Sequence, residues 1–98
     1  MQRSTALSRL TAHEPKLRSM GITALSLFGS VARDEAGPAS DVDIAVKLND
    51  ARRLDLIDFA QINLRLQDML GVKVDLVSEP ARKPVFQAQI DRDRVHAF

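Results

Sequence analysis

The chain contains no cysteine, no tryptophan and no tyrosine among its 98 residues. Without cysteine it can form neither a disulfide framework nor a zinc-thiolate site, and it has no cysteine nucleophile. Nothing in this composition is typical of a protein made for an oxidising compartment. We therefore expect a cytoplasmic location.

Long apolar runs and an excess of one charge are also missing. No run approaches the roughly 20 apolar residues that cross a bilayer, and the first residues lack the apolar stretch of a signal peptide. The 14 Lys and Arg almost balance the 13 Asp and Glu, so no basic excess favours non-specific binding to nucleic acid. We expect no membrane insertion and no direct nucleic-acid binding.

What the chain does contain is a regular alternation of apolar segments. No repeat or linker interrupts them, so we expect a single domain over residues 1–98. Asn49 or Asp50 is expected to cap the longest helix and Gly71 to end it. The order of segments predicts an α+β fold: a small three-stranded mixed sheet with helices packed on one face and carboxylates on the other. The apolar spacing predicts helices over residues 4–20, 51–70 and 85–98, a helical turn over 31–35, and strands over 22–28, 41–48 and 72–77.

The longest predicted helix has two apolar lines. The wider one is expected to face the sheet and consists of Leu56, Phe59, Ile62, Leu66, Met69 and Leu70. The second line lies on the opposite side and consists of Ile57, Ala60 and Leu64. Since the sheet cannot cover both, we expect the second line to pack on a partner or a second copy of the chain; otherwise the N- or C-terminal helix covers it.

Two carboxylates in the strand over 41–48 suggest a metal site. Asp41 and Asp43 are two residues apart, so their side chains share a face of the strand, roughly 6.5 to 7 Å apart along it. Asp75 joins them if its strand lies beside theirs. Carboxylates this close repel one another unless a cation such as Mg²⁺ lies between them. The alternative is a solvated polar face of the strand.

Gly29 and Ser30 follow an apolar strand and open a short helical turn. Glycine lets a phosphate approach the backbone, and serine supplies a hydroxyl donor. A plain turn between strand and helix accounts for the pair equally well when it is taken alone. Together with the carboxylates, however, the pair predicts a phosphate pocket and metal ligands at one end of a sheet.

The segment Leu27-Phe-Gly-Ser-Val-Ala-Arg33, followed by Ser40-Asp-Val-Asp-Ile-Ala-Val46, resembles the signature of the minimal nucleotidyltransferases (MNT). These are small prokaryotic members of the DNA polymerase beta superfamily. The Gly-Ser pair, the gap of ten residues and the Asp-x-Asp spacing all match, and the resemblance extends from about residue 22 to residue 77. It implies a nucleotidyltransferase fold and an ATP-dependent transfer that uses Mg²⁺, with two ions expected.

The resemblance also implies roles for individual residues. Gly29 and Ser30 hold the triphosphate, Asp41 and Asp43 bind Mg²⁺, and Asp75 completes the metal site and assists deprotonation of the acceptor. Arg33 matches an arginine of the family that touches phosphate or braces the loop. A surface ion pair of Arg33 with Asp34 or Glu35 is the alternative for this residue. The chain departs from the family at residue 34, where the family often has glycine, and this puts the shape of the loop in doubt.

Many MNT proteins are encoded beside a HEPN-domain ribonuclease toxin. The resemblance therefore implies an antitoxin that transfers AMP from ATP to a tyrosine of a HEPN toxin. Because this chain has no tyrosine, the modified residue must belong to another molecule. The rival hypothesis is a non-catalytic antitoxin that neutralises the toxin by forming a complex with it.

Overall fold

The computed structural model describes residues 1–51 and 53–98. Over these residues the alternation of helices and strands predicted from the sequence is confirmed, and so is the α+β class. The strands are β1 (Ile22–Phe28), β2 (Val42–Leu48), β3 (Val74–Ser78) and β4 (Val95–His96). The helices are α1 (Arg3–Ala12), α2 (Glu14–Ser19), α3 (Gly29–Ala32), α4 (Leu56–Leu70) and α5 (Pro84–Asp93).

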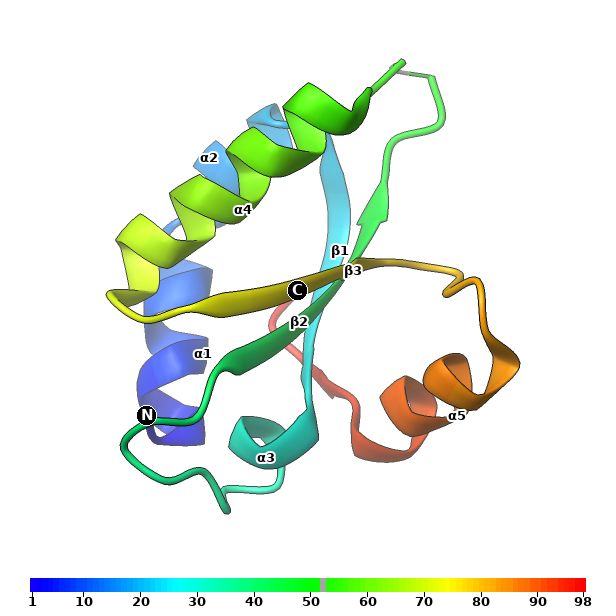
Figure 1. Ribbon diagram of the computed structural model, residues 1–98. Helices are drawn as coiled ribbons and strands as arrows, with labels where there is room; N and C mark the ends of the chain where they lie inside the picture. The colour runs from blue at the N-terminus through cyan, green and yellow to red at the C-terminus, as the bar shows by residue number, and fades with distance from the viewer. Residues whose placement is uncertain (52) are drawn as a thin grey trace.

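The strands form one sheet in the order β3-β2-β1-β4 (Figure 1). β2 pairs with β1 in antiparallel fashion and with β3 in parallel fashion. This register places Phe28 opposite Asp43, and Asp43 beside Asp75. The end of β1 and the starts of β2 and β3 therefore meet at the same end of the sheet.

The expectation of three strands is wrong for the described residues, because the chain forms a fourth after α5. The helix predicted over 85–98 ends at Asp93, and the next residue, Arg94, has an extended backbone. Val95 and His96 then pair antiparallel with Leu27 and Ser26 of β1. A strand of two residues is too short to produce a periodic pattern in the sequence.

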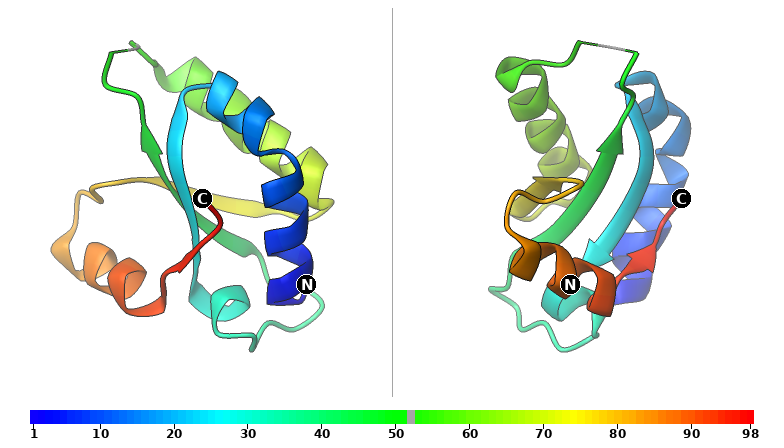
Figure 2. Two further views of the ribbon diagram at one scale, coloured as in Figure 1. Left: turned by 180° about the vertical axis from the view of Figure 1, so that it is seen from behind. Right: turned by 90° about the vertical axis from the view of Figure 1, so that its right-hand side faces the viewer.

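One face of the sheet packs against α1, α2 and α4, which lie together on one side of the strands in the left view of Figure 2. Alternate residues of β2 point into this layer, namely Val42, Ile44 and Val46, as the predicted period of two requires. Each buried aliphatic side chain of this size contributes roughly 1.5 to 3 kcal/mol. The helices contribute the buried residues Ala6, Leu10, Leu17, Ile62, Leu66 and Leu70.

The opposite face of the sheet carries a helix, α5, as well as the carboxylates. The expectation that helices pack on one face alone is therefore wrong. Ile90 of α5 is fully buried and packs with Phe28 of β1 and Ala45 of β2. In Figure 1, α5 lies on the side of the sheet away from α1, α2 and α4. The carboxylates therefore lie beside a helix, at the edge of a small second apolar cluster.

α4 begins later than predicted. Its cap is Asp55 rather than Asn49 or Asp50, because Asp55 and Asp58 each accept a hydrogen bond from the other's backbone N–H, at 2.9 and 3.0 Å. Leu56, expected to face the sheet, is 86% exposed. The predicted helix also included Arg52, which lies outside the described residues. Gly71 ends the helix with φ +73°, as predicted.

The second apolar line of α4 is exposed. Ile57 and Leu64 keep 68% and 61% of their surface accessible, and Ala60 is exposed too. Neither terminal helix covers the line, which removes that alternative. Packing on a partner or a second copy stays a prediction. Within residues 1–51 and 53–98, no helix is both long enough and apolar enough to cross a membrane.

Candidate active site

Gly29 and Ser30 lie where β1 passes into α3. Gly29 has φ +71°, a left-handed backbone conformation that favours glycine. Backbone hydrogen bonds hold the turn, from the N–H of Arg33 to the carbonyl of Gly29 at 3.1 Å and from that of Glu35 to the carbonyl of Ser30 at 2.8 Å. This end of β1 thus has a fixed shape and presents a backbone without a Cβ.

The side chain of Asp43 occupies the space that a Cβ at residue 29 would need. A Cβ placed there would overlap Oδ2 of Asp43 and lie 3.0 Å from its Cγ and 3.3 Å from its Cβ. Two features therefore favour glycine at residue 29, the positive φ and the close approach of a carboxylate. The same contact brings the Gly-Ser turn and the Asp-x-Asp strand together, as the sequence pattern predicts.

Asp43 and Asp75 are brought side by side by the parallel pairing of β2 and β3. Partial burial raises the pKa of Asp43 to about 6, and the negative charges of Asp75 and then Asp41 contribute to the rise, while the positive charge of Arg33 opposes it. Asp41 precedes β2 and is exposed. The three predicted carboxylates are thus close enough to interact electrostatically.

The donor set suits a hard cation such as Mg²⁺, because every candidate ligand is a carboxylate oxygen. A cation would also relieve the repulsion that raises the pKa of Asp43. Within the part of the chain that the structure describes, no three acidic or histidine side chains converge into a ready-made metal cluster. The residues therefore fit the ion by their chemistry and charge, with Asp43 and Asp75 as the central pair.

A cavity of about 390 Å³ lies over this end of the sheet. It contains five predicted site residues, Gly29, Ser30, Arg33, Asp43 and Asp75, but not Asp41. Three larger cavities, of about 570, 600 and 760 Å³, contain none of the predicted site residues. We place the candidate active site in the smaller cavity, because only there do the turn and the carboxylates meet.

α5 supplies the second wall of the cavity, which the sequence did not predict. Phe86, Gln89, Arg92 and Asp93 line it together with the turn and the strands. No local motif marks these four residues. Their only signal in the sequence is the helical spacing that predicted a final helix, and this says nothing about which face meets the site.

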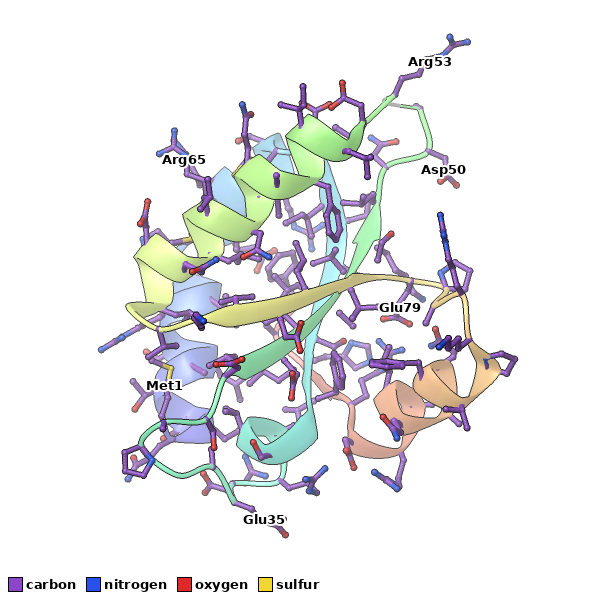
Figure 3. The ribbon with its side chains drawn as sticks, in the orientation of Figure 1. Met1, Glu35, Asp50, Arg53, Arg65 and Glu79 are labelled. Carbon is purple, nitrogen blue, oxygen red and sulfur yellow. The ribbon has the colours of Figure 1, made fainter. Side chains whose placement is uncertain are left out.

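Arg33 is tied to two carboxylates. Its Nη1 donates to Oδ2 of Asp93 at 2.6 Å and its Nε to Oε2 of Glu35 at 3.2 Å. The expected ion pair with Glu35 is therefore present, whereas the one with Asp34 is replaced by a pair with Asp93. Figure 3 shows Glu35 at the outer edge of the loop after α3, away from the sheet. Contact of Arg33 with phosphate stays a prediction.

Asp34 adopts the backbone conformation that glycine would allow at this position of the loop. It adopts φ +60°, where the family often has glycine. Aspartate tolerates this conformation better than most residues do. Its Oδ1 also accepts a hydrogen bond from the backbone N–H of Arg3 at 3.1 Å, at the start of α1. The loop keeps a left-handed shape and gains a contact with α1.

Known proteins resemble this chain over most of its length. The model of the nucleotidyltransferase domain family matches residues 10–96. The protein adenylyltransferase MntA of Thermococcus cleftensis is 36% identical over 90 residues, which cover 91% of this chain and 89% of that protein. A solved structure described as a candidate minimal nucleotidyltransferase is also 36% identical, with a TM-score of 0.80, and the match covers 97% of this chain and 95% of that one.

A second solved structure is a tri-AMPylated HEPN toxin from Shewanella oneidensis in complex with an MNT antitoxin. It contains a chain that is 25% identical to this one, with a TM-score of 0.67, and the match covers 94% of this chain and 71% of that one. The nucleotidyltransferase fold that the sequence resemblance implies is confirmed by these structures.

Proposed function

The chain belongs to the nucleotidyltransferase domain family and is a nucleotidyltransferase, and we propose that it transfers AMP from ATP to a tyrosine hydroxyl of a HEPN toxin, with Mg²⁺ as cofactor. In this role it acts as an antitoxin. The similarity to a protein adenylyltransferase and to an MNT antitoxin in complex with an AMPylated HEPN toxin supports both the reaction and the partner.

One observation carries the proposal. Gly29 approaches Asp43 so closely that a larger residue would displace the Asp43 carboxylate, and Asp75 lies beside Asp43 on the neighbouring strand. A glycine-serine turn that accepts phosphate and a pair of carboxylates therefore share one cavity. That combination serves phosphoryl chemistry, in which catalysis consists mainly of positioning and charge stabilisation.

Asp41, Asp43 and Asp75 are the residues that would hold Mg²⁺. When bound, the ion neutralises charge on the phosphates and lowers the pKa of an oxygen nucleophile. Two ions would be expected for transfer between two oxygens. Asp43 and Asp75 would bind the ion from the wall of the cavity, whereas Asp41, which is not part of that wall, would bind it from the residue just before β2.

The transfer itself is a displacement at phosphorus. The tyrosine oxygen forms a bond to the α-phosphorus of ATP, the bond from that phosphorus to the bridging β-oxygen breaks, and pyrophosphate leaves. The phenolic proton passes to Asp75. Gly29 and Ser30 hold the triphosphate through the backbone and the serine hydroxyl, and Arg33 contributes positive charge. The acceptor comes from another molecule, because this chain contains no tyrosine.

Intact-mass measurement tests the proposal. The chain is incubated with ATP, Mg²⁺ and its candidate HEPN partner, and we expect the partner to gain the mass of one or more AMP groups. Asp41→Asn combined with Asp43→Asn should abolish the gain. The matched control, Glu14→Gln with Asp50→Asn, removes two acidic groups outside the cavity and should preserve it.

Neutralisation of the toxin without any mass gain would contradict the proposal. If it also survived Asp41→Asn with Asp43→Asn, the non-catalytic antitoxin would be the better description. Repeating the reaction with EDTA, and then with restored Mg²⁺, separates a metal requirement from a loss of folding.

A further inference from the structure

Asp93, at the end of α5, joins two arginines at the edge of the candidate active site. Its side chain is only 6% exposed, whereas the side chains of Arg33 and Arg92 are 41% and 67% exposed. All three residues line the same cavity as Gly29 and Ser30. A nearly buried carboxylate thus lies beneath two guanidinium groups that reach the solvent of the cavity.

The hydrogen bonds show how Asp93 holds both groups. It accepts from Nη1 of Arg33 at 2.6 Å, and from Nε and Nη2 of Arg92 at 3.1 and 3.3 Å. The hydrogen bonds from Arg92 and then Arg33 hold the pKa of Asp93 below its usual range, so the carboxylate is ionised at neutral pH. Among the described residues, Nη2 of Arg33 and Nη1 of Arg92 have no hydrogen-bond partner.

This arrangement has the properties of an anion clamp. Two like-charged guanidiniums repel each other, and a shared carboxylate keeps them adjacent. The two arginines and Asp93 carry a net charge of +1, which the exposed carboxylate of Glu35, bonded to Nε of Arg33 from the outer side, partly offsets. Guanidinium groups bind phosphate oxygens with strong, directional hydrogen bonds. The cavity otherwise presents Asp43 and Asp75, which repel a phosphate anion unless a cation intervenes.

We infer that Arg92, together with Arg33, binds the polyphosphate tail of the nucleotide, and that Asp93 is the positioning residue that holds both guanidiniums toward it. The inference rests on the proposed function, since it concerns the same nucleoside triphosphate. It adds a phosphate contact from α5 to those from the glycine-serine turn. No motif in the sequence marks Arg92 or Asp93 for this role.

Binding of α,β-methylene ATP and of AMP, each with Mg²⁺, tests the clamp by calorimetry or competition. Arg92→Gln should weaken binding of the triphosphate about tenfold, the loss of one charge-assisted contact, and change AMP binding less than about twofold. Arg92→Lys keeps the charge without the planar fork and should weaken the triphosphate about threefold. The control Arg65→Gln removes a charge on α4, away from α3 and α5 in Figure 3 and outside the lining of the cavity, and should change neither.

Asp93→Asn separates positioning from simple charge. It removes a negative charge beside an anion site, so charge alone predicts tighter triphosphate binding. The clamp predicts the opposite, about tenfold weaker binding, because the two guanidiniums lose their common anchor. Asp93→Glu, which keeps the carboxylate, should recover part of the affinity. Circular dichroism establishes that each variant is folded; if Asp93→Asn is not, the Arg92 variants decide.

The outcomes distinguish the clamp from the proposed function. If the wild-type protein binds the triphosphate and Arg92→Gln binds it equally well, the clamp is wrong and the proposed function stands. If Asp93→Asn binds the triphosphate more tightly, Asp93 competes with phosphate and does not position the arginines. If the wild-type protein binds no triphosphate, both fall.

Discussion

Gly29→Ala should separate the two reasons for glycine at this position. The substitution places a Cβ where Asp43 Oδ2 lies, 3.0 Å from Cγ of Asp43, on a backbone with φ +71°. Alanine in the left-handed conformation costs roughly 1 to 2 kcal/mol. The Asp43 side chain must also rotate away, because its Cγ and Cβ are both too close to the new methyl group.

The rotation should cost little stability and much activity. Burial and neighbouring carboxylates already penalise the charge of Asp43, which is why its pKa is raised to about 6, so turning toward water recovers hydration. We expect Gly29→Ala to lose roughly 1 to 2 kcal/mol, or about 5 to 15 °C in Tm. Because the displaced carboxylate is a proposed metal ligand, transfer of AMP should fall about 100-fold or more.

Two other glycines provide matched controls, measured by thermal unfolding and by the AMP-transfer assay. Gly71 has φ +73° with nothing within 4 Å of the position that a methyl group would take, so Gly71→Ala should lose similar stability and keep its activity. Gly37 would place its Cβ only near Ser40 Oγ, at 3.9 Å, so Gly37→Ala should change neither. Activity of Gly29→Ala within about threefold of Gly71→Ala would refute the reasoning.

Three further predictions concern single sites. Without divalent metal, Asp43→Asn should raise the Tm above pH 6 and leave it unchanged below about pH 4. The carboxyl group of Asp43 ionises near pH 3.9 in the unfolded chain and near pH 6 in the folded one, so the stability of the wild-type protein falls as the pH rises between these values. Thermal unfolding measured over a pH series checks this. Asp34→Ala should lower the free energy of unfolding, measured with denaturant, by about 1 to 2 kcal/mol. Asp34→Gly should lower it about half as much, since glycine adopts φ +60° readily but cannot accept the hydrogen bond from Arg3. Ile57→Lys with Leu64→Lys should leave Tm unchanged, because both side chains are exposed; a large loss would mean that the chain itself covers them.

Most of the strand region around the candidate active site was predictable because its signals are local. The bounds of β1, Ile22–Phe28, agree with the predicted strand, and β2 begins one residue later than predicted. Parallel pairing of β2 and β3 puts Asp75 beside Asp43, whereas Asp41 lies just before β2 and outside the cavity. Each inference needs only a strand and its neighbour.

The parts that were missed depend on competition or on tertiary contact. Asn49, Asp50 and Asp55 can all cap a helix, and Asp55 is the cap because Asp58, three residues later, completes a capping box with it. At the end of α5, Arg94 pairs with Glu79, a contact across 15 residues. No periodic pattern reports either event, so the wall contributed by α5 could not be predicted from the sequence.

Glu79 is a central point of attachment for α5, because it accepts hydrogen bonds from Gln87 within the helix and from Arg94 at its end. α5 buries only Ile90 among its described residues. Beyond it, Arg94 Nη1 donates to Oε1 of Glu79 at 2.8 Å and to Oγ of Ser26 at 3.0 Å. Glu79 lies at the end of β3, toward α5 in Figure 3, and its side chain is 5% exposed. The hydrogen bond from Arg94 holds the pKa of Glu79 below its usual range.

Glu79→Gln should consequently loosen the wall of the site as well as the fold. Removing one partner leaves the Arg94 charge poorly compensated, and since Arg94 keeps its bonds to Ser26 and Asp91, we expect a loss of about 2 to 3 kcal/mol. Because the pKa of Glu79 is lowered by folding, the difference should be complete at pH 7 and shrink as pH falls below about 4. Hydrogen exchange should show the greatest loss of protection in α5, and triphosphate binding should weaken with it.

The exposed pair of Glu14 with Arg18 is the control, where Glu14→Gln should lower the free energy of unfolding by less than about 0.5 kcal/mol. Uniform loss of protection across all strands would contradict a local role for the pair.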